Sequence, residues 1–95
     1  MKKKIAILGS TGSIGQSTLN VIQKDKKNFD IILLSANNNY KLLINQARKF
    51  NAKNVLIKNN NYYLKVKNSL RKTKTKVYSG DISIKKIVRR KLDYT

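Results

Sequence analysis

The sequence predicts an α/β protein with a Rossmann-like open parallel sheet and helices on both faces. Short apolar runs alternate with segments whose apolar residues recur every three or four positions. This alternation is typical of strands that are followed by crossover helices. The first apolar run also leads into three evenly spaced glycines and then into a helical pattern, within Ile5–Ile22, IAILGSTGSIGQSTLNVI. A strand, a tight turn and a helix start are therefore expected in the first 22 residues.

The first unit is predicted as a strand at Lys4–Leu8, followed by a loop and by a helix from about residue 14 to residue 24. Gly9, Gly12 and Gly15 stand at every third position of the loop. A turn of this kind directs unpaired N–H groups and the positive end of a helix dipole at one point, which favours an anion such as a pyrophosphate. We expect Gly12 to let the phosphate approach and the other two glycines to serve the geometry of the turn.

Two other glycine-containing turns, the P-loop and the nucleophile elbow, are excluded because the chain lacks residues that each of them requires. A P-loop needs a glycine five residues after Gly9, where Ile14 stands, and a lysine after it. A nucleophile elbow needs a serine with glycines two positions to either side, and the chain also has no histidine to act as the base. A dinucleotide-type loop remains, with an ordinary glycine-rich turn as the alternative.

The later elements continue the alternation. The near-continuous apolar run Ile31–Ala36 predicts a strand that is buried on both faces of a parallel sheet. Further strands are expected at Asn54–Ile57 and Lys76–Ser79, and helices at Tyr40–Asn51, at about Tyr62–Arg71 and at Ile82–Arg90. A Rossmann order places the first strand centrally, so the sheet is expected to be incomplete at the C-terminal end, with the first strand at an unpaired edge.

Candidate cofactor contacts lie in the loop. Its backbone N–H groups are expected to bind the pyrophosphate, and its hydroxyls can add hydrogen bonds. For Ser13, a role as the N-cap of the helix is an equal alternative. The cofactor-binding candidates of the loop are Ser10, Thr11, Gly12, Ser13 and Ile14.

A second group of candidates follows the second strand. Sites for NAD usually place Asp or Glu there for the ribose 2′-hydroxyl, and such a carboxylate would repel a 2′-phosphate. This chain has the neutral residues Asn37, Asn38 and Asn39, with Lys41 close by. We therefore expect NADP(H) rather than NAD(H), with a simple polar turn as the alternative.

The amino-acid sequence of the loop and its flanks resembles that of a known enzyme family. GSTGSIGQSTLNVI, preceded by KIAIL and followed by SANNN, resembles the start of 1-deoxy-D-xylulose 5-phosphate reductoisomerases. The resemblance implies NADPH, a divalent metal (Mg or Mn), and conversion of 1-deoxy-D-xylulose 5-phosphate to 2-C-methyl-D-erythritol 4-phosphate in non-mevalonate isoprenoid synthesis. It also implies contacts with the 2′-phosphate through Asn37, Asn38 and Asn39. Family members often have a glycine in place of Asn37 and a basic residue in place of Asn38, so this chain departs from them.

The same resemblance bears on what the chain contains. Residues 1–95 would be the N-terminal part of an NADP(H)-binding domain, without the catalytic and C-terminal domains of a homodimeric enzyme. No catalytic residue and no metal ligand is expected here, because the carboxylates are isolated and lack metal-ligand spacing. They are Asp25, Asp30, Asp81 and Asp93. The chain alone is expected to bind cofactor and not to catalyse.

Composition raises an alternative function. The net charge of +18 is typical of proteins that bind nucleic acid or anionic membranes. The lysines are scattered, however, and are joined by many asparagines and no glutamate, as A/T-rich coding would produce. We therefore expect a cytoplasmic, soluble protein without nucleic-acid or membrane partners, and no apolar run reaches the length of a membrane span. The alternatives are another NAD(P) oxidoreductase, or a nucleic-acid-binding module that stacks bases on Tyr62, Tyr63 and Tyr78.

Overall fold

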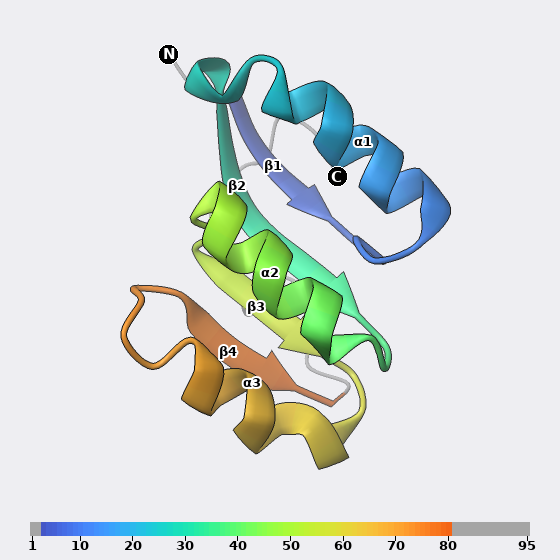
Figure 1. Cartoon of the computed structure of the whole chain (residues 1–95), viewed down its shortest axis with the longest axis vertical. Coiled ribbons are helices and arrows are strands. Elements are labelled where there is room, and N and C mark those ends of the chain that lie inside the picture. Colours follow the sequence, from blue (N-terminus) through green and yellow to red (C-terminus); the bar gives the residue numbers. More distant parts are fainter. Residues whose placement is uncertain (1–2, 81–95) are drawn as a thin grey trace.

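A computed structural model describes residues 3–80, which form one parallel sheet (Figure 1). Its strands are β1 (Lys3–Ile7), β2 (Phe29–Ala36), β3 (Asn54–Ile57) and β4 (Lys76–Ser79), in the order β1-β2-β3-β4. All neighbouring pairs are parallel. The Rossmann-like parallel sheet predicted from the sequence is confirmed, and within the described residues β1 lies at an edge of it, as expected.

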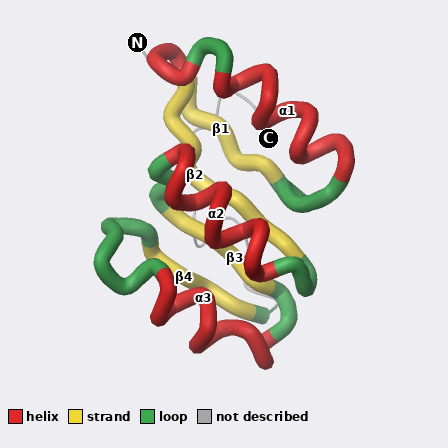
Figure 2. Tube along the Cα trace, in the orientation of Figure 1, coloured by secondary structure: helices red, strands yellow, loops and turns green. Residues whose placement is uncertain are grey.

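The helices of residues 3–80 all pack on one face of the sheet (Figure 2). They are α1 (Ser13–Gln23), α2 (Tyr40–Phe50) and α3 (Tyr63–Ser69), with 3-10 turns at Lys26–Asn28 and Asn60–Tyr62. Each connection moves one strand further in the same direction, so connections of one hand bring every helix to the same side. Helices were expected on both faces, and within residues 3–80 the other face carries none. The helix expected at Ile82–Arg90 lies outside the described residues.

Most boundaries follow the sequence pattern. The predicted bounds of β3 and β4 are confirmed, and Asn51 ends α2 in the left-handed region with φ 52°. β2 begins two residues before the predicted start at Ile31, because Phe29 and Asp30 pair with β1 and already belong to the strand. The helix expected at about Tyr62–Arg71 is shorter, since a 3-10 turn precedes it and it ends at Ser69.

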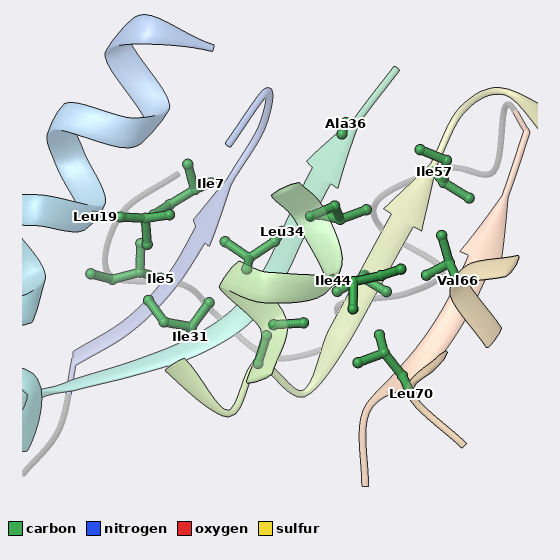
Figure 3. Packing of buried hydrophobic residues seen from close by; sticks show 14 of the residues in the cluster. Ile5, Ile7, Leu19, Ile31, Leu34, Ala36, Ile44, Ile57, Val66 and Leu70 are labelled. Carbon is green, nitrogen blue, oxygen red and sulfur yellow. The ribbon is translucent and has the colours of Figure 1, made fainter. Parts of the chain in front are cut away.

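The main core lies between the helices and the sheet (Figure 3). Its larger members are Ile5, Ile7, Leu19, Ile22, Ile31, Leu34, Leu43, Ile44, Val55, Ile57, Val66 and Leu70. A second, smaller cluster of Ala6, Leu33 and Leu56 occupies the opposite face of the sheet, with Tyr78 packed against it. The two central strands are thus buried on both sides, as the apolar run of β2 predicted for that strand.

Some apolar residues of the helices do not enter this core. Ile14, Val21 and Leu64 are 84%, 66% and 65% exposed. In α1 the buried positions are Gly15, Leu19 and Ile22, which follow the three- and four-residue spacing of one helix face. The exposed Ile14 lies instead beside the glycine loop, where it borders a groove.

Candidate nucleotide-binding site

The loop between β1 and α1 is closed by its glycines. Gly9 has φ +68°, a conformation that side chains rarely adopt, and its carbonyl accepts a hydrogen bond from the Gly12 N–H at 3.0 Å. Gly12 is the N-cap of α1 in an extended conformation, and its carbonyl accepts from the N–H of Gln16 at 2.9 Å. The chain therefore turns sharply from the end of β1 into α1.

Gly15 allows α1 to pack directly on this loop. A Cβ atom at Gly15 would lie 2.5 Å from the Gly9 carbonyl oxygen and 2.6 Å from the Cα of Ser10. At Gly12 a Cβ would meet only the Gly9 oxygen, at 3.4 Å. Gly9 and Gly15 therefore have the geometric roles predicted for them, whereas Gly12 leaves open space on the outer side of the loop.

The inner side of the loop is fixed to β2 and α2. Ser35 of β2 accepts from the Gly9 N–H with its hydroxyl at 3.0 Å and from the Ser10 N–H with its carbonyl at 2.8 Å. The hydroxyl of Ser10 donates to the same carbonyl at 3.3 Å, and the Gln46 side chain of α2 donates to the Ser10 carbonyl at 2.8 Å. Ser10 is fully buried. Its N–H, hydroxyl and carbonyl are all bonded inside the protein, which is unfavourable for the predicted contact of the hydroxyl with a cofactor; that contact stays a prediction.

The outer side of the loop presents free donors. Within residues 3–80, the N–H groups of Thr11, Ser13 and Ile14 donate no hydrogen bond. The Gly12 N–H closes the turn by donating to the Gly9 carbonyl, and its binding of the pyrophosphate stays a prediction. Ser13 is not the N-cap, since α1 begins at Ser13 and Gly12 holds the cap position without a side-chain bond. No acidic residue stands in the first turn of α1, so nothing there competes for an anion.

A groove of about 570 Å³ adjoins these donors. It is lined by residues 6–9, 12–15 and Thr18, along the outer side of β1 and the start of α1. The groove combines apolar walls from Leu8 and Ile14 with the polar first turn of a helix. Apolar walls with a few placed polar groups are the usual make-up of a cofactor site.

The three asparagines follow β2 at the same edge of the sheet as the loop, because Ser35 already touches the loop and Asn37 is two residues further on. The side-chain oxygen of Asn39 accepts from the Leu42 N–H at 3.3 Å and caps α2. The side-chain oxygen of Asn38 accepts from the Asn59 amide at 2.8 Å. Within the described residues, the exposed side chain of Asn37 makes no hydrogen bond.

No carboxylate lies at this edge among the described residues. Asp25 and Asp30 are at the other end of the sheet, before and at the start of β2, and Asp30 pairs with Lys53 at 3.0 Å. Residues 3–80 contain no cluster of three metal-ligating side chains and no helix long and apolar enough to cross a bilayer. The described part of the chain thus offers donors for an anion at this edge of the sheet.

The sequence profile of the 1-deoxy-D-xylulose 5-phosphate reductoisomerases matches residues 5–95. The chain belongs to this family. The reductoisomerase of Pelagibacter ubique is 48% identical over 95 residues, and that of Phocaeicola vulgatus is 47% identical over 88 residues. These alignments cover 98% and 93% of the chain but only 24% and 23% of the relatives. The chain therefore spans about a quarter of the length of the curated relatives it matches.

Solved structures agree with this assignment. The reductoisomerase from Zymomonas mobilis in complex with NADPH superposes with a TM-score of 0.82 at 34% identity, over 84% of this chain and 21% of that one. A second reductoisomerase structure, with NADPH, fosmidomycin and magnesium, superposes with a TM-score of 0.78 at 28% identity, over 83% of this chain and 20% of that one. The described fold is thus that of the N-terminal part of reductoisomerases.

Three residues that support the site were missed at the sequence level. Ser35 had a visible signal, as the one polar residue within the apolar run of β2. Gln46 stands among polar residues of α2, and nothing local indicates that it is buried. Asn59 stands in a run of asparagines, and nothing local indicates that it joins the ends of β2 and β3.

Proposed function

We propose that this chain is the NADPH-binding part of a 1-deoxy-D-xylulose 5-phosphate reductoisomerase. The observation that carries the proposal is the set of N–H groups at Thr11, Ser13 and Ile14, which have no acceptor within residues 3–80. Ser13 and Ile14 also line the groove. Such a helix start binds pyrophosphate through its N–H groups and its dipole. The NADPH-bound relative from Zymomonas mobilis supports the choice of cofactor.

The adenosine end of NADPH would lie at the asparagines. Neutral side chains after β2 accept a 2′-phosphate without charge repulsion, and Asn37 and Asn38 have amide N–H groups available for it. Asn39 uses its side-chain oxygen to cap α2, so its contribution would come from N–H groups. When bound, NADPH supplies the hydride that reduces a carbonyl, and the residues of this chain hold and orient it.

The remaining parts of the proposed activity have no counterpart in residues 3–80. The Mg²⁺ or Mn²⁺ ion and the sugar phosphate would be bound by residues outside this range, because no suitable cluster of ligands lies within it. We derive no catalytic step from the described residues. A cytoplasmic homodimer, and the absence of nucleic-acid or membrane partners, are proposed from the resemblance and from the scattered lysines.

The nucleic-acid alternative loses its main support. Tyr62 and Tyr63 pack against the core, and Tyr62 stacks on Tyr40 with ring centroids 4.6 Å apart. Tyr78 packs on the cluster at the opposite face of the sheet. These rings are not exposed side by side, so they do not form a platform for successive bases.

The proposal is tested by titrating the isotope-labelled chain with NADPH and with NADH, and by following backbone amide resonances. We expect saturable shifts at Thr11, Ser13 and Ile14 with both cofactors, and tighter binding of NADPH. The resonances of the 3-10 turn at Lys26–Asn28 serve as an internal control, because that turn precedes β2 and lies at the edge of the sheet opposite the loop and the asparagines. Shifts confined to residues outside the loop and the asparagines would contradict the proposal.

A further inference from the structure

Asn59 lies outside the loop and outside the predicted cofactor contacts, yet it links the two strands that end beside them. Its backbone N–H donates to the carbonyl of Asn37 at 3.0 Å. Its side-chain N–H donates to the side-chain oxygen of Asn38 at 2.8 Å, across 21 residues of sequence. Asn59 is half-buried between the ends of β2 and β3.

The direction of this side-chain bond is fixed by the backbone. The side-chain oxygen of Asn59 accepts from the Asn61 N–H at 3.0 Å, and a backbone N–H can only donate. The NH₂ group of Asn59 must therefore face Asn38, and Asn38 must meet it with its oxygen. The relay from Asn61 through Asn59 orients the Asn38 amide, which leaves the NH₂ group of Asn38 as the end that is free to donate.

This orientation matters for charge. An amide that presents its NH₂ group favours a phosphate, whereas the same amide turned over would present an oxygen and repel it. The main chain cannot turn over with it, because the carbonyl of Asn38 accepts from the Tyr40 N–H at 2.8 Å. We infer that Asn59 is a positioning residue that selects NADP(H) over NAD(H) by holding the Asn38 amide with its donors toward the 2′-phosphate. This inference rests on the proposed function.

The test uses Asn59→Asp in the full chain. Aspartate still accepts from the Asn61 N–H and still caps the 3-10 turn, so the local backbone is preserved. Its second oxygen, however, faces Asn38 and would turn the Asn38 amide over. We expect the dissociation constant for NADP⁺ to rise at least about tenfold, while that for NAD⁺ changes less than about twofold.

Two matched variants isolate the cause. Asn60→Asp adds the same charge one residue away, on an exposed side chain that is not bonded to Asn38, and should leave the ratio of the two dissociation constants near that of the original chain. In an Asn38→Ala background, Asn59→Asp should lose most of its effect, because the group through which it acts is gone. Both constants are measured by calorimetric or NMR titration, and retained NAD⁺ binding shows that each variant is folded.

Three outcomes would overturn the inference. One is an equal loss of NADP⁺ and NAD⁺ binding in Asn59→Asp, which would indicate a general disturbance of the site. Another is the same loss of NADP⁺ binding in Asn60→Asp, or an undiminished effect in the Asn38→Ala background, either of which would indicate simple charge repulsion. The third is an original chain that binds neither cofactor, which would also overturn the proposed function, whereas the first two would leave that function standing.

Discussion

The three loop glycines have different structural roles, which follow from their backbone angles and from the atoms that a Cβ would meet at each position. Gly9 is needed for its positive φ, Gly15 for the contact between α1 and the loop, and Gly12 for open space toward the groove. The spacing alone predicted all three roles. It could not predict that the Gly12 N–H closes the turn, since that depends on the conformation of Gly9.

Substitutions at Gly12 and Gly15 should separate binding from folding. Gly12→Ala should leave the melting temperature nearly unchanged, because the extended backbone accepts a Cβ, yet weaken NADPH binding at least about tenfold by filling space needed by the phosphate. Gly15→Ala should lower the free energy of unfolding by roughly 1–3 kcal/mol, because its Cβ would overlap backbone atoms. Thermal unfolding and NADPH titration measure the two effects. Normal NADPH affinity in Gly12→Ala would show that phosphate does not bind there.

Among the secondary-structure elements, α2 has a role that its sequence pattern hides. Its apolar face packs on the sheet as predicted, but Gln46 on the same face reaches the loop and bonds the Ser10 carbonyl. The side-chain oxygen of Gln46 is buried without a partner within the described residues. α2 therefore supports the nucleotide loop through one donor in an otherwise apolar contact.

Replacing this donor should destabilise the protein in a pH-dependent way. In Gln46→Glu, burial raises the pKa of the introduced carboxyl above the value of about 4.3 that it has in the unfolded chain. Below the unfolded-state pKa of about 4.3, the protonated carboxyl can still donate to Ser10, and the variant should approach the stability of the original chain. As the pH rises above that value, the free energy of unfolding of the variant should fall, and the decrease should level off at roughly 2 kcal/mol near neutral pH. Urea unfolding at several pH values measures this, and a loss that is the same at pH 3.5 and pH 7 would contradict it.

The sequence predicts those features of the elements that depend on neighbouring residues, and it does not predict those that depend on contacts between distant residues. β3, β4 and the end of α2 at Asn51 are set by local apolar runs and by local backbone preference, and they were predicted. The start of β2 at Phe29 depends on pairing with β1, and the burial of Ser10 depends on Ser35 and Gln46. Contacts between residues 25 to 36 positions apart do not affect the local pattern of apolar and polar residues, so these features were not predicted.

At the scale of the whole molecule, the net charge of +18 is balanced by few ion pairs among the described residues. One ion pair, between Lys53 and Asp30, lies within residues 3–80. Several lysines instead rest on aromatic rings, such as Lys65 at 5.3 Å from the ring centre of Tyr40. The remaining positive field surrounds the molecule and attracts anions in general.

Binding to DNA should therefore be weak, independent of sequence and sensitive to salt. We expect the affinity for a labelled duplex to fall steeply between about 50 and 200 mM salt, because counterion release is its sole driving force. Anisotropy titrations of two unrelated duplexes measure it. Affinity that persists at about 150 mM salt, together with no NADPH binding, would favour the nucleic-acid alternative.

The division of the loop into an inner and an outer side also predicts how fast its amide protons exchange with solvent. The Ser10 amide is bonded to β2 and fully buried, so its exchange requires the loop to separate from the sheet. The neighbouring amides of Thr11, Ser13 and Ile14 have no acceptor within the described residues and should exchange orders of magnitude faster. Saturating NADPH should slow these three while leaving Ser10 nearly unchanged. Residues 10–14 thus contain one protected amide, that of Ser10, and three amides whose exchange responds to cofactor binding. If NADPH slows exchange at the three and not at Ser10, the cofactor occupies the loop; if it slows all four, the whole sheet has become more stable.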